Sequence, residues 1–167
     1  MSAPAEASKN PRFELTFAPT VILVSVVRNF IHDFYQRVIG KEATERIAMA
    51  THELLENALR YSAEDGATLK VEVAQHPTVD HVTIRIRNRP SESHVGPLKE
   101  ALAKMNEIPD PDLHYLMVMR ESWRRKDTSG LGLARLRAEG GMRLSLELEG
   151  DYVCIVAQCD LEKQGAS

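Results

Sequence analysis

The chain has 167 residues, 43% of them hydrophobic, so it can bury one sizeable core at a length where a single domain is usual. Its 21 Lys and Arg against 24 Asp and Glu give a net charge of −3, which argues against a cationic nucleic-acid-binding or lipid-binding surface. The longest strongly apolar run, Val21–Val27, is interrupted by Ser25 and is far shorter than the roughly 20 residues that cross a bilayer. We therefore expect no nucleic-acid partner and no membrane partner.

The two ends of the chain bear on domain limits and compartment. Residues 1–11 lack the apolar segment of a secretion signal, and we expect them to form a disordered leader before a single domain at residues 12–162. Cys154 and Cys159 lie five apart in one predicted strand, so they point to opposite faces and cannot bridge each other. These features favour the reducing cytoplasm.

Five segments alternate apolar and polar residues with period two, which predicts five strands that each have one wet face. Their apolar positions are Phe13, Leu15 and Phe17; Leu69, Val71 and Val73; Val82, Ile84 and Ile86; Leu144, Leu146 and Leu148; and Val153, Ile155 and Ala157. This pattern predicts a mixed, mainly antiparallel sheet with helices on one face, because a parallel sheet buried on both faces shows unbroken apolar runs. On the open face, we expect Arg85 and Arg87 to pair across strands with neighbours such as Lys70 or Glu72.

Helices are predicted between the strands, over residues 20–39, 42–61, 96–106, 112–125 and 131–139. Gly40 ends the first helix, Asp110-Pro111 is a start signal for the fourth, and Gly140-Gly141 ends the last. Residues 149–152 predict a tight hairpin between the last two strands. The fold class is therefore an α/β (α+β) two-layer sandwich with about five strands.

The second long helix carries two polar residues at the edge of its apolar stripe. Glu53 and Asn57 are four apart, so they stand one turn above each other beside Leu54 and Ala58. A carboxylate and a carboxamide so placed could supply a general base and an oxygen ligand for Mg²⁺. The alternative is an ordinary amphipathic helix whose border residues happen to be Glu and Asn.

A glycine-containing box, Ser129-Gly130-Leu131-Gly132, follows a polar run and leads directly into the last helix. Glycines let the backbone approach a ligand closely, and the free N–H groups at a helix N-terminus suit phosphate. The alternative is a plain junction between a loop and a helix.

Together these segments resemble the histidine-kinase-like ATPases (GHKL, Bergerat fold), and most of all the bacterial anti-sigma-factor serine/threonine kinases. The matching stretches are His52-Glu53-Leu54-Leu55-Glu56-Asn57-Ala58 and Ser129-Gly130-Leu131-Gly132-Leu133-Ala134, and the order of elements agrees over residues 13–159. The resemblance implies a Bergerat-type fold that binds ATP and Mg²⁺. By similarity, Glu53 would be the general base, Asn57 would bind Mg²⁺, and Gly130 and Gly132, with Ser129 and Leu131 in the same box, would hold the triphosphate.

One position departs from the family pattern. Relatives follow the middle strand with an Asp, which accepts a hydrogen bond from adenine, and then glycines; this chain has Asn88-Arg89-Pro90. Asn88 keeps the phase of Ile84 and Ile86, so its side chain should point into the helix-covered layer. A neutral amide bonds less strongly than a carboxylate, and we expect adenine selectivity with weakened affinity. The alternative is that Asn88 only caps the strand end and the pocket takes no nucleotide.

Residues 91–128 lie where relatives carry a mobile lid. Their basic residues could meet phosphates or an acidic partner, or could form a solvated helix end: Arg120, Arg124, Arg125 and Lys126. His52 should point away from the core and is not expected to be a phosphoacceptor. The six histidines show no zinc-ligand spacing, and the chain has neither a nucleophile elbow nor a P-loop lysine.

The resemblance implies a cytoplasmic signal-transduction protein that transfers the γ-phosphate of ATP to a Ser or Thr of a small, STAS-like (anti-anti-sigma-like) partner. It would exchange that partner with a sigma factor, and a homodimer is also implied. The alternative function is a non-catalytic interaction module of the same fold with weakened or lost nucleotide binding. Asn88 and Pro90 favour the alternative, whereas Glu53 and Asn57 oppose it.

Overall fold

A computed structural model describes residues 10–125 and 130–163, which form five strands and five helices. The leader expected over residues 1–11 lies almost wholly outside this range. In chain order the elements are β1 (Arg12–Phe17), α1 (Val21–Ile39), α2 (Lys41–Tyr61), β2 (Ser62–Ala74), β3 (Val79–Pro90), α3 (Glu92–Glu107), α4 (Pro111–Arg125), α5 (Leu131–Ala138), β4 (Arg143–Glu149) and β5 (Tyr152–Glu162).

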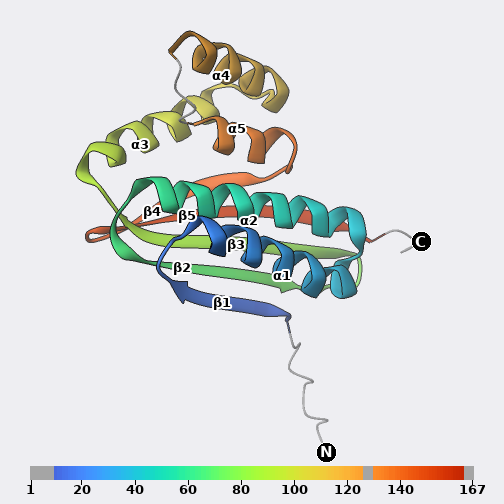
Figure 1. The fold of residues 1–167 in the computed structure, drawn as a ribbon. Helices are drawn as coiled ribbons and strands as arrows, with labels where there is room; N and C mark the ends of the chain where they lie inside the picture. Colours follow the sequence, from blue (N-terminus) through green and yellow to red (C-terminus); the bar gives the residue numbers. More distant parts are fainter. Residues whose placement is uncertain (1–9, 126–129, 164–167) are drawn as a thin grey trace, which may run out of the picture.

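The strands form one sheet in the order β1-β2-β3-β5-β4, and the helices cover one of its faces (Figure 1). Each neighbouring pair of these described strands is antiparallel, so the sheet contains no parallel pair in this part of the chain. The predicted two-layer sandwich is confirmed, and so is the hairpin between β4 and β5.

The register brings the apolar positions of the five strands into line. One rung runs across the whole sheet through Leu15, Leu69, Ile86, Ile155 and Leu146. These residues share a face because the side-chain period of a strand is two, and the same face packs on the helices. The apolar residues of the alternating pattern therefore form the inner face of the sheet.

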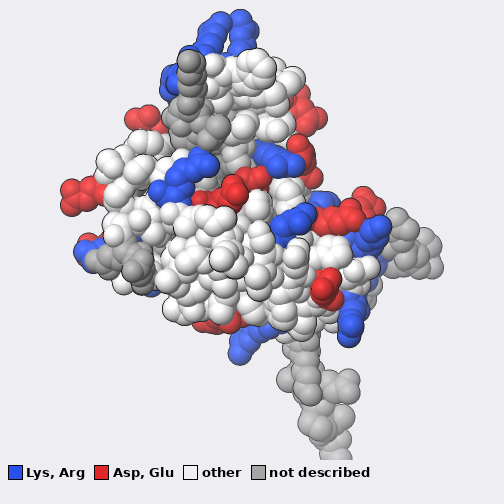
Figure 2. Space-filling model, viewed as in Figure 1, with Lys and Arg blue, Asp and Glu red and all other residues white. Residues whose placement is uncertain are grey.

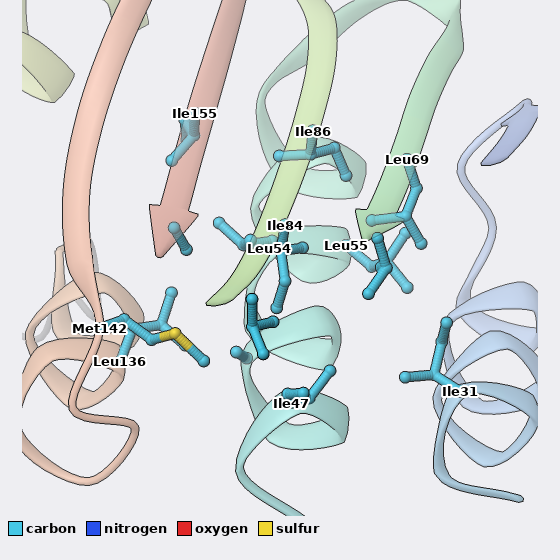
Figure 3. Packing of buried hydrophobic residues seen from close by; sticks show 14 of the residues in the cluster. Ile31, Ile47, Leu54, Leu55, Leu69, Ile84, Ile86, Leu136, Met142 and Ile155 are labelled. Carbon is cyan, nitrogen blue, oxygen red and sulfur yellow. The ribbon is translucent and has the colours of Figure 1, made fainter. Parts of the chain in front are cut away.

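The core lies between this face and the helices. Ile47, Leu54 and Leu55 of α2 are fully buried over the middle strands, and Ile31 of α1 and Leu136 of α5 extend the cluster to either side (Figure 3). Full burial of such a side chain contributes roughly 1.5–3 kcal/mol. The central helix, α2, is therefore held in one rotational setting by the sheet beneath it.

The first helix is tied to the sheet by a buried phenol. Thr20 caps α1 by accepting from the Leu23 N–H at 3.3 Å, and the Tyr35 hydroxyl donates to the Val71 carbonyl of β2 at 2.7 Å. Burial raises the pKa of Tyr35, so this donor keeps its proton at any physiological pH.

The open face of the sheet differs from the expectation. Three ion pairs join β3 to β4 and its turn across β5: Arg85–Glu147 at 2.7 Å, Arg87–Glu149 at 2.8 Å and Arg89–Asp151 at 3.1 Å. Arg85 and Arg87 reach over β5 at Val156 and Cys154, the short side chains that stand opposite them in the register. Lys70 pairs instead with Glu14 of β1, at 3.9 Å. The expected pairing of the arginines with Lys70 or Glu72 is therefore wrong.

Both cysteines are buried free thiols on opposite faces of β5, as the odd spacing predicts.

None of the helices in the described ranges is long and apolar enough to cross a bilayer. The third helix begins at Glu92, one turn before the expected start, with Pro97 inside it.

Candidate functional site

A cavity of about 720 Å³ lies between α2, α3, the start of α5 and the strands β3 and β5. Its apolar wall comes from Ala58 of α2, Leu133 of α5 and three strand residues, Ile86, Val153 and Ile155. This volume is within the range of small-molecule sites, which are mostly apolar with a few polar groups.

Three of the residues singled out by motif line this cavity: Asn57 of α2, Asn88 of β3 and Gly130 at the start of α5. They come from three segments that are far apart in the sequence. Leu131 and Gly132 are half-buried at the start of α5 but do not line the cavity. Ser129 lies outside the described residues.

Asn88 faces the helix-covered layer, in the phase that the strand pattern predicts. Its side chain is 4% exposed, and its Nδ2 donates to the Ser62 hydroxyl at 2.9 Å. Ser62 is in reach because it directly follows α2 and stands opposite Pro90, next to an irregularity in the β2–β3 register. The amide is therefore oriented by a neighbour at the wall of the cavity.

Glu53, one turn before Asn57, is directed at α5 and does not line the cavity. Its Oε1 accepts from the Arg135 Nη1 at 3.1 Å, and its side chain is only 13% exposed. Arg135 also donates from Nε to Glu139 at 2.8 Å. The pKa of the Arg135 guanidinium is raised, first by the bond to Glu139 and further by Glu53. The candidate base thus sits in a three-residue ionic cluster that joins α2 to α5.

The two glycines of the box do different things. Gly130 has φ +82°, a left-handed conformation that favours glycine, and it caps α5 without a side-chain hydrogen bond. A Cβ on Gly132 would lie 2.6 Å from Glu53 Oε2, so this glycine lets α5 approach the carboxylate on α2. The two motifs therefore meet in space, through Gly132 and Glu53.

The cavity also has a cationic side, in which Arg125 is one of the expected basic residues, and an aromatic side that the motifs did not indicate. Arg60 and Arg125 line it, and so does the Tyr61–His94 pair, whose ring centroids are 4.6 Å apart. His94 also contacts the Ser91 hydroxyl. Tyr61 stands one turn after Asn57, which is the one signal that could have found it. His94 has no such signal because only the fold brings α3 to the end of α2.

The expected basic patch is divided. Arg120, Arg124 and Arg125 are all exposed, and of these three Arg125, the last residue of α4, lines the cavity. Lys126 lies outside the described residues.

His52, expected on the surface, is half-buried beside α1, and its Nε2 lies 3.3 Å from Glu56 Oε1. It lies outside the hydrophobic core cluster, as expected, and it is only partly exposed because α1 covers this side of α2.

Comparisons with known proteins support the fold. No family model matches the chain, and no curated protein matches it. Among solved structures, the fold is similar to a chain in the crystal structure of the SiaB-SiaC complex from Pseudomonas aeruginosa, with a TM-score of 0.62 and 13% sequence identity. The match covers 92% of this chain and 92% of that chain. At this level of identity the likeness establishes the shared architecture.

Proposed function

We propose that this protein is an ATP-binding regulator that transfers the γ-phosphate of ATP to a Ser or Thr of a small protein partner. The observation that carries the proposal is the convergence of Asn57, Asn88 and Gly130 on one cavity. Glu53 and Gly132 meet directly beside it. The resemblance of the two motifs to the anti-sigma-factor kinases supports the same assignment.

The residues around the cavity fit a magnesium nucleotide. Apolar side chains suit a purine ring, and the Asn88 amide could both accept from and donate to an adenine edge. Arg60, Arg125 and the uncapped start of α5 suit phosphates, and the Asn57 oxygen suits Mg²⁺. When bound, Mg-ATP would supply the phosphoryl group and neutralise its charge, which leaves the protein mainly with positioning.

Glu53 would accept the proton of the attacking hydroxyl, which requires its carboxylate to change partners. The carboxylate must turn from Arg135 towards the cavity that Asn57 lines, a movement within one turn of α2. Arg135 would keep Glu139 as a partner after that turn, so its charge stays compensated. The step therefore exchanges one partner of Glu53 without isolating a charge.

A protein partner is part of the proposal. The solved neighbour is a complex of two proteins, which supports a small regulatory partner here. We propose a STAS-like acceptor domain, a sigma factor, or both in turn, in the cytoplasm.

The homodimer that the family resemblance implies would have a place on α1. Ile22, Val26, Phe30 and Phe34 form an exposed stripe, and the Phe30 ring packs at a tilt against Phe13 of the edge strand β1 with centroids 4.8 Å apart. The surface over α1 is largely without charged side chains (Figure 2). Sedimentation of the wild type and of Phe30→Glu would test this dimer, which the substitution should dissociate.

Thermal unfolding with and without Mg-ATP tests nucleotide binding. At a ligand concentration of 100 times Kd, binding to the native state contributes about 2.7 kcal/mol, which raises Tm by roughly 5–11 °C for a chain of this size. Asn57→Ala should remove most of the shift that depends on Mg²⁺. Asn29→Ala, at an exposed position of α1, is the matched control and should keep it.

Phosphoryl transfer to a STAS-domain acceptor tests catalysis. Glu53→Gln should retain the Mg-ATP shift and lose transfer by at least about 100-fold, as removal of a general base does. Glu56→Gln, on the same helix at a more exposed position, should transfer normally. Equal transfer by both variants would exclude Glu53 as the base.

A second function, the non-catalytic interaction module, is favoured by two observations. Glu53 is bound to Arg135 outside the cavity, and the Asn88 amide is bound to Ser62 where relatives have an Asp. If Mg-ATP shifts neither the wild type nor Asn88→Asp, this second function replaces the first. If Mg-ATP raises the Tm of Asn88→Asp alone, the chain retains the site but has lost nucleotide binding.

A further inference from the structure

The fourth helix carries an apolar surface on the side that faces away from the protein. Its inner side packs on α5 through His114, the one buried residue within the described helix, with half-buried Val118 and Ser122 beside it. On the other side Leu113, Leu116, Met117 and Trp123 are 51%, 61%, 46% and 83% exposed. The helix therefore turns its larger apolar side chains towards solvent.

These exposed residues form one continuous strip. At about 100° per residue, Leu113, Leu116, Met117, Arg120 and Arg124 fall on a single side of the helix, with Trp123 at its border. We call this strip, with Trp123, the outer face of α4. Its first two turns are apolar and its last two turns are basic.

Arg120 and Arg124, at the basic end, form no ion pair with another described residue, whereas five arginines elsewhere in the described chain each pair with a carboxylate: Arg85, Arg87, Arg89, Arg135 and Arg143. Figure 2 shows Lys and Arg side chains at the end of the molecule where α4 lies, beside an uncharged area. Single exposed apolar side chains are ordinary, but a contiguous apolar patch with a charged border is typical of an interaction surface.

We propose that the outer face of α4 docks a helical segment of a protein partner, with an apolar stripe that is followed by acidic residues. The apolar stripe would cover Leu113, Leu116 and Met117, and the acidic residues would meet Arg120 and Arg124. Helix-on-helix docking of this kind places anchors at i, i+3 and i+4, which is the spacing that these three residues show. Trp123 provides an aromatic anchor at the border.

The distribution of charge along α4 selects a protein over a lipid surface. Helices that lie on anionic membranes carry basic residues along their whole polar side. Here Asp110 and Asp112 stand at the start of the helix, and they would meet the same bilayer as the apolar turns. Acidic residues at one end and basic residues at the other instead give a partner helix a fixed direction.

Trp123 is the single tryptophan of the chain, so its fluorescence reports directly on this surface. The probes are a synthetic amphipathic helical peptide of Leu, Ala and Glu, its counterpart with Lys in place of Glu, and vesicles that contain phosphatidylglycerol. The acidic peptide should shift the emission to shorter wavelength and saturate with a Kd below about 1 mM, whereas the basic peptide should not bind.

Substitutions on the outer face give the matched controls. The double substitution Arg120→Glu with Arg124→Glu should weaken binding of the acidic peptide at least about tenfold. It should also allow the basic peptide to bind, because the charges are exchanged. Lys99→Glu with Lys104→Glu makes the same change of charge on exposed positions of α3 and should leave binding unaltered. Leu116→Asp should abolish binding, and its circular dichroism should match the wild type because the position is exposed.

Three results would overturn the proposal. They are no saturable shift with the acidic peptide, equal shifts with both peptides, and a shift with the vesicles. None of these depends on phosphoryl transfer, so the docking surface and the proposed kinase activity can fail separately.

Discussion

The helices α2 and α4 show how differently two helices of one chain can be held. The helix α2 is packed along its inner side. Eight of its 21 residues are buried, and most of these lie over the sheet. In α4 one of 15 residues is buried, and the helix rests on α5 away from the sheet (Figure 1). A helix with its apolar stripe on a sheet is fixed in rotation, whereas a helix with its stripe in solvent is available to another molecule.

The candidate site lies where these two regions meet. Glu53, Asn57 and Asn88 come from the well-packed part, and their positions are set by the core. Gly130 and Arg125 come from the segments on either side of the α4–α5 connection. One wall of the cavity is therefore built on the core, and another is formed where α4, with its single buried residue, ends and α5 begins.

Leu54→Ala should have the largest effect on stability. The side chain is fully buried beneath α2, so its removal should lower the free energy of unfolding by about 2–5 kcal/mol. Leu116→Ala removes the same atoms from the outer face of α4 and should change it by less than about 0.5 kcal/mol. Urea denaturation of both variants measures the difference, and equal losses would mean that α4 is packed in solution.

Gly132→Ala should have a smaller effect on folding and a large one on the site. The new Cβ would displace the Glu53 carboxylate, a flexible group, at a cost of about 1–2 kcal/mol. Phosphoryl transfer should fall as in Glu53→Gln. Gly96→Ala is the control, because a Cβ there meets no atom within 4 Å. Normal transfer by Gly132→Ala would show that the close approach of α5 to α2 does not matter.

Arg135→Ala should cost about 1 kcal/mol, since it leaves the nearly buried Glu53 carboxylate without its cation. The value is held down because the Arg135 side chain is 43% exposed and water screens the pair. Arg143→Ala breaks a more exposed pair with Asp160 and should cost less. A double-mutant cycle with Glu53→Gln measures the coupling, and a coupling of zero would remove Arg135 as the partner that holds the base.

Acid should lower the free energy of unfolding through protonation of His114 in α4. This is the smallest of the four effects predicted here. Burial lowers the pKa of His114, and Arg137 lowers it further, so the folded state favours the neutral ring. The unfolded chain binds the proton more readily, so stability is complete above the unfolded pKa of about 6.5 and falls as the pH drops below it. His114→Gln should flatten this loss between pH 7 and pH 5 in urea titrations. An unchanged slope in His114→Gln would contradict this prediction.

Most of the fold could be predicted because local patterns decide it. Alternation with period two in five segments located the strands, and the stripe that contains Ile47 and Leu54 located α2. The motifs named Asn57, Asn88 and Gly130, which line one cavity. The pairing of Arg85 and Arg87 could not be predicted, because it depends on which strand lies on the far side of β5.

By itself the sequence determined the layers of this protein and the polar groups that the inner layer presents, because side-chain period and burial follow from local spacing. Only the tertiary structure decided that Glu53 is bound by Arg135, that Tyr61 and His94 stand together, and that α4 turns its apolar side outward. Each of these depends on segments distant in the chain. Contacts of that kind depend on how whole helices and strands pack against each other, and the spacing of residues along the chain does not predict that packing.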